Sequence, residues 1–200
     1  MQNQSEAIVR IDGHEYSMNV SGIERFEDFL EILKGFIDPD NMIVEILYNG
    51  NQISDVEWNG PFAKFHGGSF DVKTDTPENF ARSRLKESPY IVSAILKIIR
   101  ESRLLFAEGK VMEANQLMIT GVNALKEFFC WFGTVTQLAG SDLNNKYQIN
   151  DIVEKLVKEC EKVAQAQLYQ SWWGISETLK LNVEPLLDEL ETRLRLGQQK

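Results

Sequence analysis

The stretch VMEANQLMITGVNALKEFFCWFGTV, residues 111–135, has the most regular helical periodicity in the 200-residue chain. Its apolar residues recur at alternating intervals of three and four positions: Val111, Ala114, Met118, Gly121, Leu125, Phe128, Phe132 and Val135. This alternation is typical of a helix that packs at a shallow angle in a left-handed bundle. Further apolar residues widen the stripe on both flanks, so we expect the helix to contact two neighbours: Leu117, Val122, Phe129 and Trp131.

Three other long helices are predicted around this stretch. Ser88-Pro89 places a capping residue before a proline at the first helical position, and Gly109 offers the stop. Two later apolar stripes predict the other two helices: Ile149, Val153, Leu156, Cys160 and Val163, then Trp172, Ile175, Leu179, Val183, Leu186, Leu190 and Leu194. Pro185 lies off the last stripe and predicts a kink or a break near residues 181–184. We therefore expect an antiparallel bundle of four main helices.

The N-terminal part has shorter elements and more turns. Asp12-Gly13 separates two partly alternating runs, residues 7–11 and 16–20, and predicts a hairpin, because a type I′ turn needs positive φ at both central residues. Ser21-Gly22-Ile23-Glu24 has the spacing of a capping box and predicts the start of an amphipathic helix. Three strands are then predicted, a mostly apolar one at residues 42–48, a short one at 52–54 and a last one at 69–73.

This order of strand, strand, helix, strand, short strand and strand resembles the ubiquitin-like β-grasp fold over roughly residues 6–74. The resemblance implies a scaffold that many proteins use for docking, although a fold by itself does not set a function. Ubiquitin-type modifiers end in a free Gly-Gly tail, whereas this chain runs on beyond Lys73, so conjugation through that end is excluded. We expect an α+β protein with a β-grasp-like domain at residues 1–75 and the helical bundle at residues 76–200, joined at Asp75-Thr76-Pro77.

The helical part resembles the bundles of bacterial flagellar export chaperones, from the LLFAEGK stretch at residues 104–110 through Ala114-Asn115 to the PLLDE stretch at residues 185–189. Those chaperones are small helical proteins that clamp an apolar segment of a partner. The resemblance implies a binding role of that kind and assigns no functional residue, because the shared letters are those of any amphipathic bundle.

Charge divides the chain in the same place. Residues 1–80 carry 15 acidic and 5 basic side chains, a net charge of −10, whereas residues 81–200 carry 15 acidic and 16 basic ones. The acidity of the whole chain, −9, weighs against nucleic acid as a partner. No apolar run approaches the roughly 20 residues that cross a bilayer, and the first residues lack the pattern of a secretory signal. We expect a cytoplasmic protein.

The search for catalytic or cofactor chemistry is negative. The sequence has no phosphate-binding glycine motif, no His-Glu-x-x-His, no nucleophile elbow and no CxxC. His14 and His66 lie next to turns and read as surface residues rather than metal ligands. Cys160 is predicted to point into the bundle and Cys130 away from it, so we expect two free thiols. We therefore expect no enzyme, no cofactor and no metal.

Two groups of residues are candidates for binding a partner. Consecutive aromatic residues around position 130 cannot all face one core, and neither can Trp172 and Trp173. They either fill a wide core or a domain interface, or line an apolar groove for a partner helix or peptide. The acidic face of the first helix is either a solvated surface or a docking surface for a basic partner. The candidate residues are Trp131, Trp173, Phe129, Glu24, Glu27, Asp28 and Glu31.

These observations predict a non-enzymatic interaction protein, such as an adaptor, chaperone or assembly factor, that binds a partner peptide or helix. The alternative is a sensor or carrier of an apolar small molecule, held between the bundle helices near Trp131 and Trp172. An enzyme would require His66 to cluster with acids such as Asp38 or Asp55 in a cleft. The sequence identifies neither the partner nor the oligomeric state.

Overall fold

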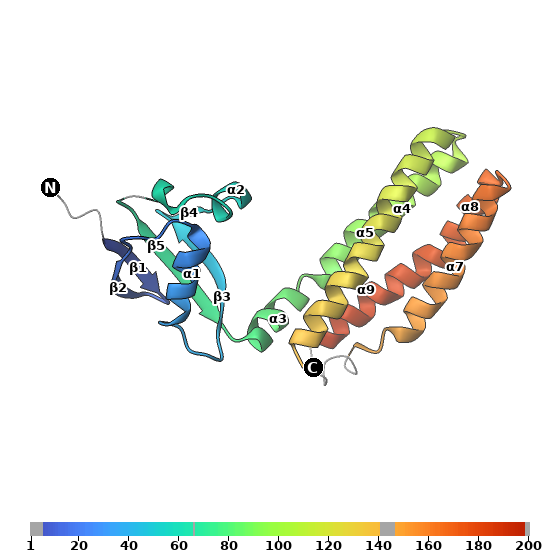
Figure 1. The fold of residues 1–200 in the computed structure, drawn as a ribbon. Coiled ribbons are helices and arrows are strands. Elements are labelled where there is room, and N and C mark those ends of the chain that lie inside the picture. Colours follow the sequence, from blue (N-terminus) through green and yellow to red (C-terminus); the bar gives the residue numbers. More distant parts are fainter. Residues whose placement is uncertain (1–5, 66, 141–146, 199–200) are drawn as a thin grey trace. The chain divides into compact units, whose positions relative to one another are not determined.

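The computed structural model describes residues 6–65, 67–140 and 147–198 and has a mixed α+β fold, with a five-stranded sheet followed by several helices (Figure 1). The chain forms two compact units, residues 1–80 and residues 81–200, which we describe separately. His66 and residues 141–146 lie outside the described residues.

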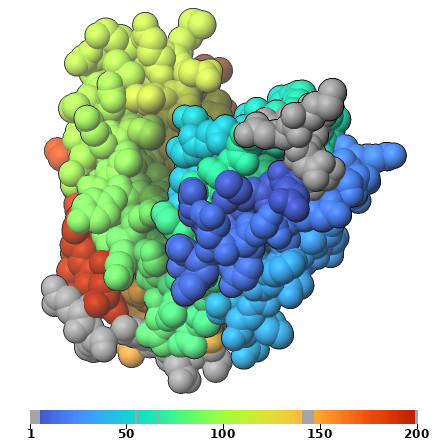
Figure 2. Space-filling view, turned by 90° about the vertical axis from the view of Figure 1, so that its left-hand side faces the viewer, coloured from blue at the N-terminus to red at the C-terminus, as the bar shows by residue number. Residues whose placement is uncertain are grey.

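The sheet of the first unit begins with the predicted hairpin. Strands β1 (Glu6–Ile11) and β2 (His14–Asn19) pair antiparallel, and Figure 2 presents their side of the unit in dark blue. Asp12 and Gly13 between them have φ values of 50° and 85°. The positive φ at both positions confirms the turn that Asp-Gly predicts, since this conformation costs glycine little and aspartate less than most residues.

The five strands follow the order β2-β1-β5-β3-β4. Strand β5 (Ser69–Asp75) is central, parallel to β1 and antiparallel to β3 (Met42–Tyr48), which also pairs with the two-residue β4 (Asn51–Gln52). One face of the sheet buries Val9, Phe70 and Val72. The three predicted strands after the helix are therefore present, the shortest of them one residue earlier than expected.

Helix α1 (Phe26–Lys34) buries Phe26, Phe29 and Leu33 in the core of this unit. The prediction that the helix starts at Ser21 was wrong, because the Ser21 amide and hydroxyl both donate to the side-chain oxygen of Asn19, at 2.9 and 2.6 Å. The Asp28 carboxylate instead accepts from the Arg25 amide at 3.2 Å and caps the helix. Two short helices were not predicted, α2 (Asp55–Trp58) and the 3₁₀ turn η1 (Phe62–Lys64).

The described residues of the second unit form helices joined by short turns. Helix α3 (Pro77–Leu85) crosses the boundary between the two units. It is followed by α4 (Ser88–Ala107), α5 (Val111–Leu138), α7 (Asn150–Leu168), α8 (Trp172–Thr178), the π-helical turn η2 (Leu179–Val183) and α9 (Glu184–Gln198). Helix α4 packs against α5, α8 and α9, and α7 packs against α8 and α9. Gly109 has a φ of 76° and ends α4 as predicted.

The periodic stripe of α5 faces the core as predicted. Seven of its eight positions are buried, and only Val111 at the first turn is half-exposed. Gly121 lets α4 approach, because a Cβ there would lie 2.7 Å from Cδ1 of Ile99. Among the described helices, α4 packs most extensively on α5, and α7 also reaches it, because Gln167 Nε2 donates to Asn115 Oδ1 at 3.1 Å. On the flanks of the stripe, Val122 and Trp131 line grooves.

The break predicted near Pro185 is the π-helical turn η2. Proline has no N–H to continue the helical ladder, and a π turn accommodates one extra residue. In α9, Leu190 and Leu194 are fully buried as predicted, whereas Leu187 is buried and the predicted Leu186 is half-exposed. The predicted stripe was therefore wrong at Leu186, where the extra residue places Leu187 in the core.

Candidate functional site

The surface of the helical unit has a groove between α5 and α7, which we call the α5–α7 groove. Its volume is about 250 Å³, and its lining comes from α4, α5, α7 and η2. It forms because α5 packs on α4 while α7 packs on α8 and α9, which leaves the facing sides of α5 and α7 to line a channel over the core. The lining residues are Ile99, Met118, Ile119, Val122, Asn123, Leu125, Cys160, Val163, Ala164, Gln167, Leu179 and Val183.

None of these lining residues is charged. The floor is buried core, whereas the wall residues Ile119 and Val122 are 49% and 41% exposed. At one end, Gln167 Nε2 donates to Asn115 Oδ1 across the two helices at 3.1 Å. Burial raises the pKa of the Cys160 thiol, with the nearby Glu159 adding to the shift, so this thiol stays protonated at neutral pH. The groove can accept apolar side chains, and the protonated Cys160 thiol in its lining is a weak nucleophile.

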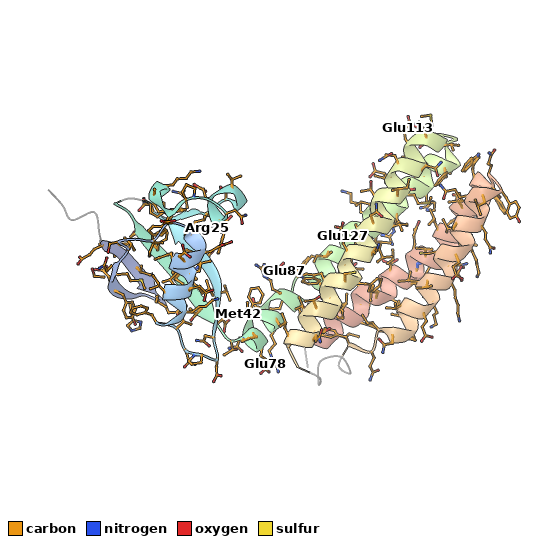
Figure 3. All side chains as sticks on the ribbon, in the orientation of Figure 1. Arg25, Met42, Glu78, Glu87, Glu113 and Glu127 are labelled. Carbon is orange, nitrogen blue, oxygen red and sulfur yellow. The ribbon has the colours of Figure 1, made fainter. Side chains whose placement is uncertain are left out.

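A second groove lies in the first unit, beside α1, and we call it the α1 groove. Its volume is about 550 Å³. Its lining combines apolar side chains from α1, the following loop, β3 and α2 with charged ones from α1 and the loop, and Met42 of this lining is labelled in Figure 3. The lining residues are Glu27, Leu30, Glu31, Lys34, Ile37, Asp38, Pro39, Asn41, Met42, Ile43 and Trp58.

A third groove, of about 420 Å³, lies along the outer side of α4 and α5 and contains Trp131. Trp131 is half-buried, and its ring lies 6.0 Å from that of Phe128. Glu87 and Glu127, both labelled in Figure 3, line this groove together with apolar residues of α4. Trp131 therefore contributes both to the core edge and to a groove, the two alternatives that the sequence left open.

The structure does not bring the other predicted residues into one site. Trp173 is 76% exposed at the start of α8, whereas its neighbour Trp172 stacks on Phe106 at 6.1 Å. Phe129 is half-buried against Phe128. Of the four predicted acids, Glu27 and Glu31 line the α1 groove, while Glu24 and Asp28 are exposed outside its lining.

On the outer face of the sheet, by contrast, charged side chains form ion pairs with one another across neighbouring strands. Arg10 bridges Glu15 and Asp71 on the neighbouring strands at 3.2 and 3.5 Å. Lys73 pairs with Glu45 at 2.5 Å, which raises the pKa of the lysine. These cross-strand ion pairs leave a mixed polar surface with little to attract a charged partner.

Within the described residues, no three or more His, Cys, Asp or Glu side chains gather as a metal site would require. His14 is exposed on β2, and Cys130 and Cys160 are free thiols, the first exposed and the second half-buried. Across the same part of the chain, no helix has the length and apolar character to pass through a membrane.

The sequence missed the α5–α7 groove. The sequence signal for it lies in Ile119 and Val122, two of the apolar residues outside the alternating stripe of α5, both of which are exposed in the groove wall. No family model, no curated protein and no solved structure matches the chain. A functional assignment therefore depends on the surfaces that the chain itself presents.

Proposed function

We propose that this protein is a non-enzymatic interaction module that holds an apolar segment of a partner protein, an amphipathic helix or an extended peptide, in the α5–α7 groove. The observation that carries the proposal is the uncharged lining of this groove, in which Ile119 and Val122 stay exposed beside a buried floor. Apolar side chains of a partner would gain about 25 cal/mol for each Å² removed from water there. An apolar helix face laid into such a groove is a recurring mode of recognition.

The alternative, an apolar small molecule in the bundle, has weaker support. The groove measures about 250 Å³. Pockets for drug-sized ligands usually enclose about 300–1,000 Å³. A panel of small apolar molecules in a thermal-shift assay distinguishes the two ideas, because a ligand present at 100 times its Kd stabilises the folded state by about 2.7 kcal/mol.

The architecture that we propose agrees with this role. For the first unit we propose a β-grasp domain, supported by the strand order β2-β1-β5-β3-β4 and the parallel pairing of β1 with β5. For the second unit we propose an antiparallel bundle of four main helices, α4, α5, α7 and the α8–α9 segment, supported by their packing. An adaptor, chaperone or assembly factor of the cytoplasm is the class of protein proposed, with no catalytic role and no nucleic-acid partner.

The test places a charge in the groove wall. Val122→Glu changes a side chain that is 41% exposed, and the matched control Leu104→Glu changes one that is 50% exposed on α4, outside the groove. Both variants should keep the helical circular dichroism of the wild type. A protein that co-purifies with the wild type from its native cells should be lost with Val122→Glu and retained with Leu104→Glu. Loss with both variants, or retention with both, contradicts the proposal.

The two cysteines give an independent measurement. In a Cys130→Ser variant the groove thiol of Cys160 reacts alone, and in Cys160→Ser the exposed Cys130 does. Binding of the partner should slow modification of Cys160 by a thiol reagent and leave the rate at Cys130 unchanged. Equal protection of both thiols would place the partner elsewhere.

A further inference from the structure

The α1 groove combines an apolar floor with an acidic rim and lies entirely within the first unit. Leu30, Ile37 and Ile43 are each half-buried, so they are neither closed into the core nor fully solvated. Trp58 lines the same groove, and its ring packs edge-on against Phe26 at 5.1 Å, which holds it in place. The groove therefore has a rigid apolar surface on which the side chain of another molecule can rest.

The charge beside this floor is one-sided. Residues 24–40 contain six acids and two bases, and three of the acids, Glu27, Glu31 and Asp38, line the groove. Glu27 pairs with Arg25 at 3.2 Å and Glu31 with Lys34 at 2.6 Å, in side chains that are all more than half exposed. Such exposed pairs stabilise a fold only weakly, so a ligand cation can replace the internal one at little cost.

Asp38 has the least local compensation of the three acids. Its carboxylate accepts from the Asp40 amide at 3.0 Å, and no ion pair to it is found among the described residues. On the outer face of the sheet, Arg10 and Lys73 already form ion pairs with carboxylates of neighbouring strands. The segment that borders the α1 groove, residues 24–40, therefore keeps an excess of four negative charges, and Asp38 places one carboxylate, unpaired within the described residues, in the lining itself.

We infer that the α1 groove is a second docking site, which binds a basic amphipathic peptide segment of a partner protein. A large apolar side chain of the peptide would occupy the floor between Leu30, Ile43 and Trp58. Lysine or arginine residues flanking it would pair with Glu27, Glu31 and Asp38, and an arginine could also lie over the indole of Trp58. This site differs in chemistry from the uncharged α5–α7 groove, so the two would select unlike segments.

The test begins without assuming a partner. Random peptides of about 12 residues, displayed on phage, are selected on the purified full-length chain carrying Val122→Glu, which removes apolar binding to the α5–α7 groove. The enriched sequences should combine a large apolar residue with at least two Lys or Arg residues. Enrichment of sequences without basic residues overturns it.

The strongest peptide is then synthesised, and its Kd is measured by fluorescence anisotropy against two variants that lose the same charge. Glu27→Gln/Glu31→Gln/Asp38→Asn neutralises the rim, and Glu6→Gln/Glu15→Gln/Asp71→Asn neutralises three acids elsewhere in the unit. The rim variant should raise the Kd about tenfold or more, and the control variant by less than about threefold. Equal losses mean that net charge alone attracts the peptide, and they overturn the inference.

Amide chemical shifts of the labelled full-length chain locate the peptide directly. The largest shift changes should occur at residues 27–43 and at Trp58. The Kd of the peptide should also rise when the salt concentration is increased. Changes concentrated on β1 and β5, or in the helical unit, overturn it. Failure of this test leaves the α5–α7 groove untouched, because the two sites share no residue.

Discussion

At the level of single residues, Glu184 of α9 is a largely buried acid that pairs with two arginines of α4. Its side chain is only 8% exposed, and Oε1 accepts from Arg103 Nε at 2.5 Å while Oε2 lies 3.4 Å from Arg100 Nε. Glu184→Ala leaves the partly buried Arg103 without its carboxylate and should lower the free energy of unfolding by about 3 kcal/mol. Urea denaturation measures this, with the exposed Glu101→Ala as the control. A loss no larger than that of the control would contradict the expectation.

Two glycines in helices should respond in opposite directions to the same substitution. A Cβ at Gly197 would lie 2.3 Å from Cδ1 of the buried Tyr147 ring, whereas one at Gly133 meets no atom within 4 Å. Gly197→Ala should therefore destabilise the protein by about 1–3 kcal/mol through overpacking. Gly133→Ala should stabilise it by about 0.5–1 kcal/mol, because alanine loses less backbone entropy in a helix. Melting temperatures that move in the same direction would contradict the prediction.

The sequence predicts the burial of single residues where helical periodicity determines it, and does not predict it on the flanks of a stripe. The alternating spacing of α5 identified the residues that face its core, Met118 and Phe132 among them. It could not separate Trp131, which lines a groove, from Trp173, which is solvent-exposed, because both lie on the flank of an apolar stripe. The distinction depends on which neighbouring helix lies beside that flank.

At the scale of elements, the link between α7 and α9 should produce a dependence of stability on pH. Arg193 of α9 donates to both carboxylate oxygens of Asp151 in the first turn of α7, and the pKa of Asp151 falls from 3.8 to about 2 chiefly because of this bond. A lowered pKa in the folded state means that the stabilisation is fully present above about pH 4. It is lost as the pH falls toward 2.

Asp151→Asn should therefore remove part of the loss of stability between pH 4 and pH 2 and lower the stability at neutral pH. Urea denaturation at a series of pH values measures both effects. The matched control is Glu154→Gln on the exposed side of α7, for which the pH profile should resemble that of the wild type. Identical profiles for Asp151→Asn and the wild type would show that the bond adds no stability.

The π-helical turn sets the register of the helix that follows it, a property that the sequence did not predict. Pro185 predicts that the last helix is interrupted, because proline cannot donate the hydrogen bond that the ladder needs. A kink, a break and an inserted residue all satisfy this requirement, and they differ in the register of the helix that follows. The inserted residue buries Leu187 in place of Leu186 and puts Leu179 and Val183 on the floor of the α5–α7 groove. That register depends on packing against α4.

At the scale of the whole molecule, the hydrophobic core of the helical unit is closed within residues 81–194. The separate core of the first unit lies within residues 7–72. We therefore expect a fragment of residues 76–200 to fold without the first unit. It should keep its helical circular dichroism and unfold cooperatively on heating. A non-cooperative transition with strong binding of a hydrophobic dye would show that the fragment needs residues 1–75.

The division into two chemically different parts was visible in the sequence, since the net charge of −10 before residue 81 gives way to a nearly neutral remainder. The grooves were not visible, because each is lined by segments far apart in the chain. The α1 groove joins Glu27 to Trp58, and the α5–α7 groove joins Ile99 to Val183. The sequence shows which residues lie on each helix face. The distance between two faces, which decides whether a groove opens between them, depends on the packing of the whole unit.

The parallel pairing of β1 with β5 also has a consequence for the order of folding. Ile8 pairs with Ser69, so the sheet forms only after a long loop closes, whereas α4 and α5 are neighbours in the chain. Domains rich in local contacts fold faster than those that depend on distant ones, so the helices should form well before the sheet. Trp58 is the single tryptophan of the first unit and can report on it once the other three are replaced by phenylalanine. Stopped-flow refolding should then show a helical circular dichroism signal that precedes the Trp58 fluorescence change. The order of folding would thus be opposite to the order of synthesis, in which the residues of the sheet come first.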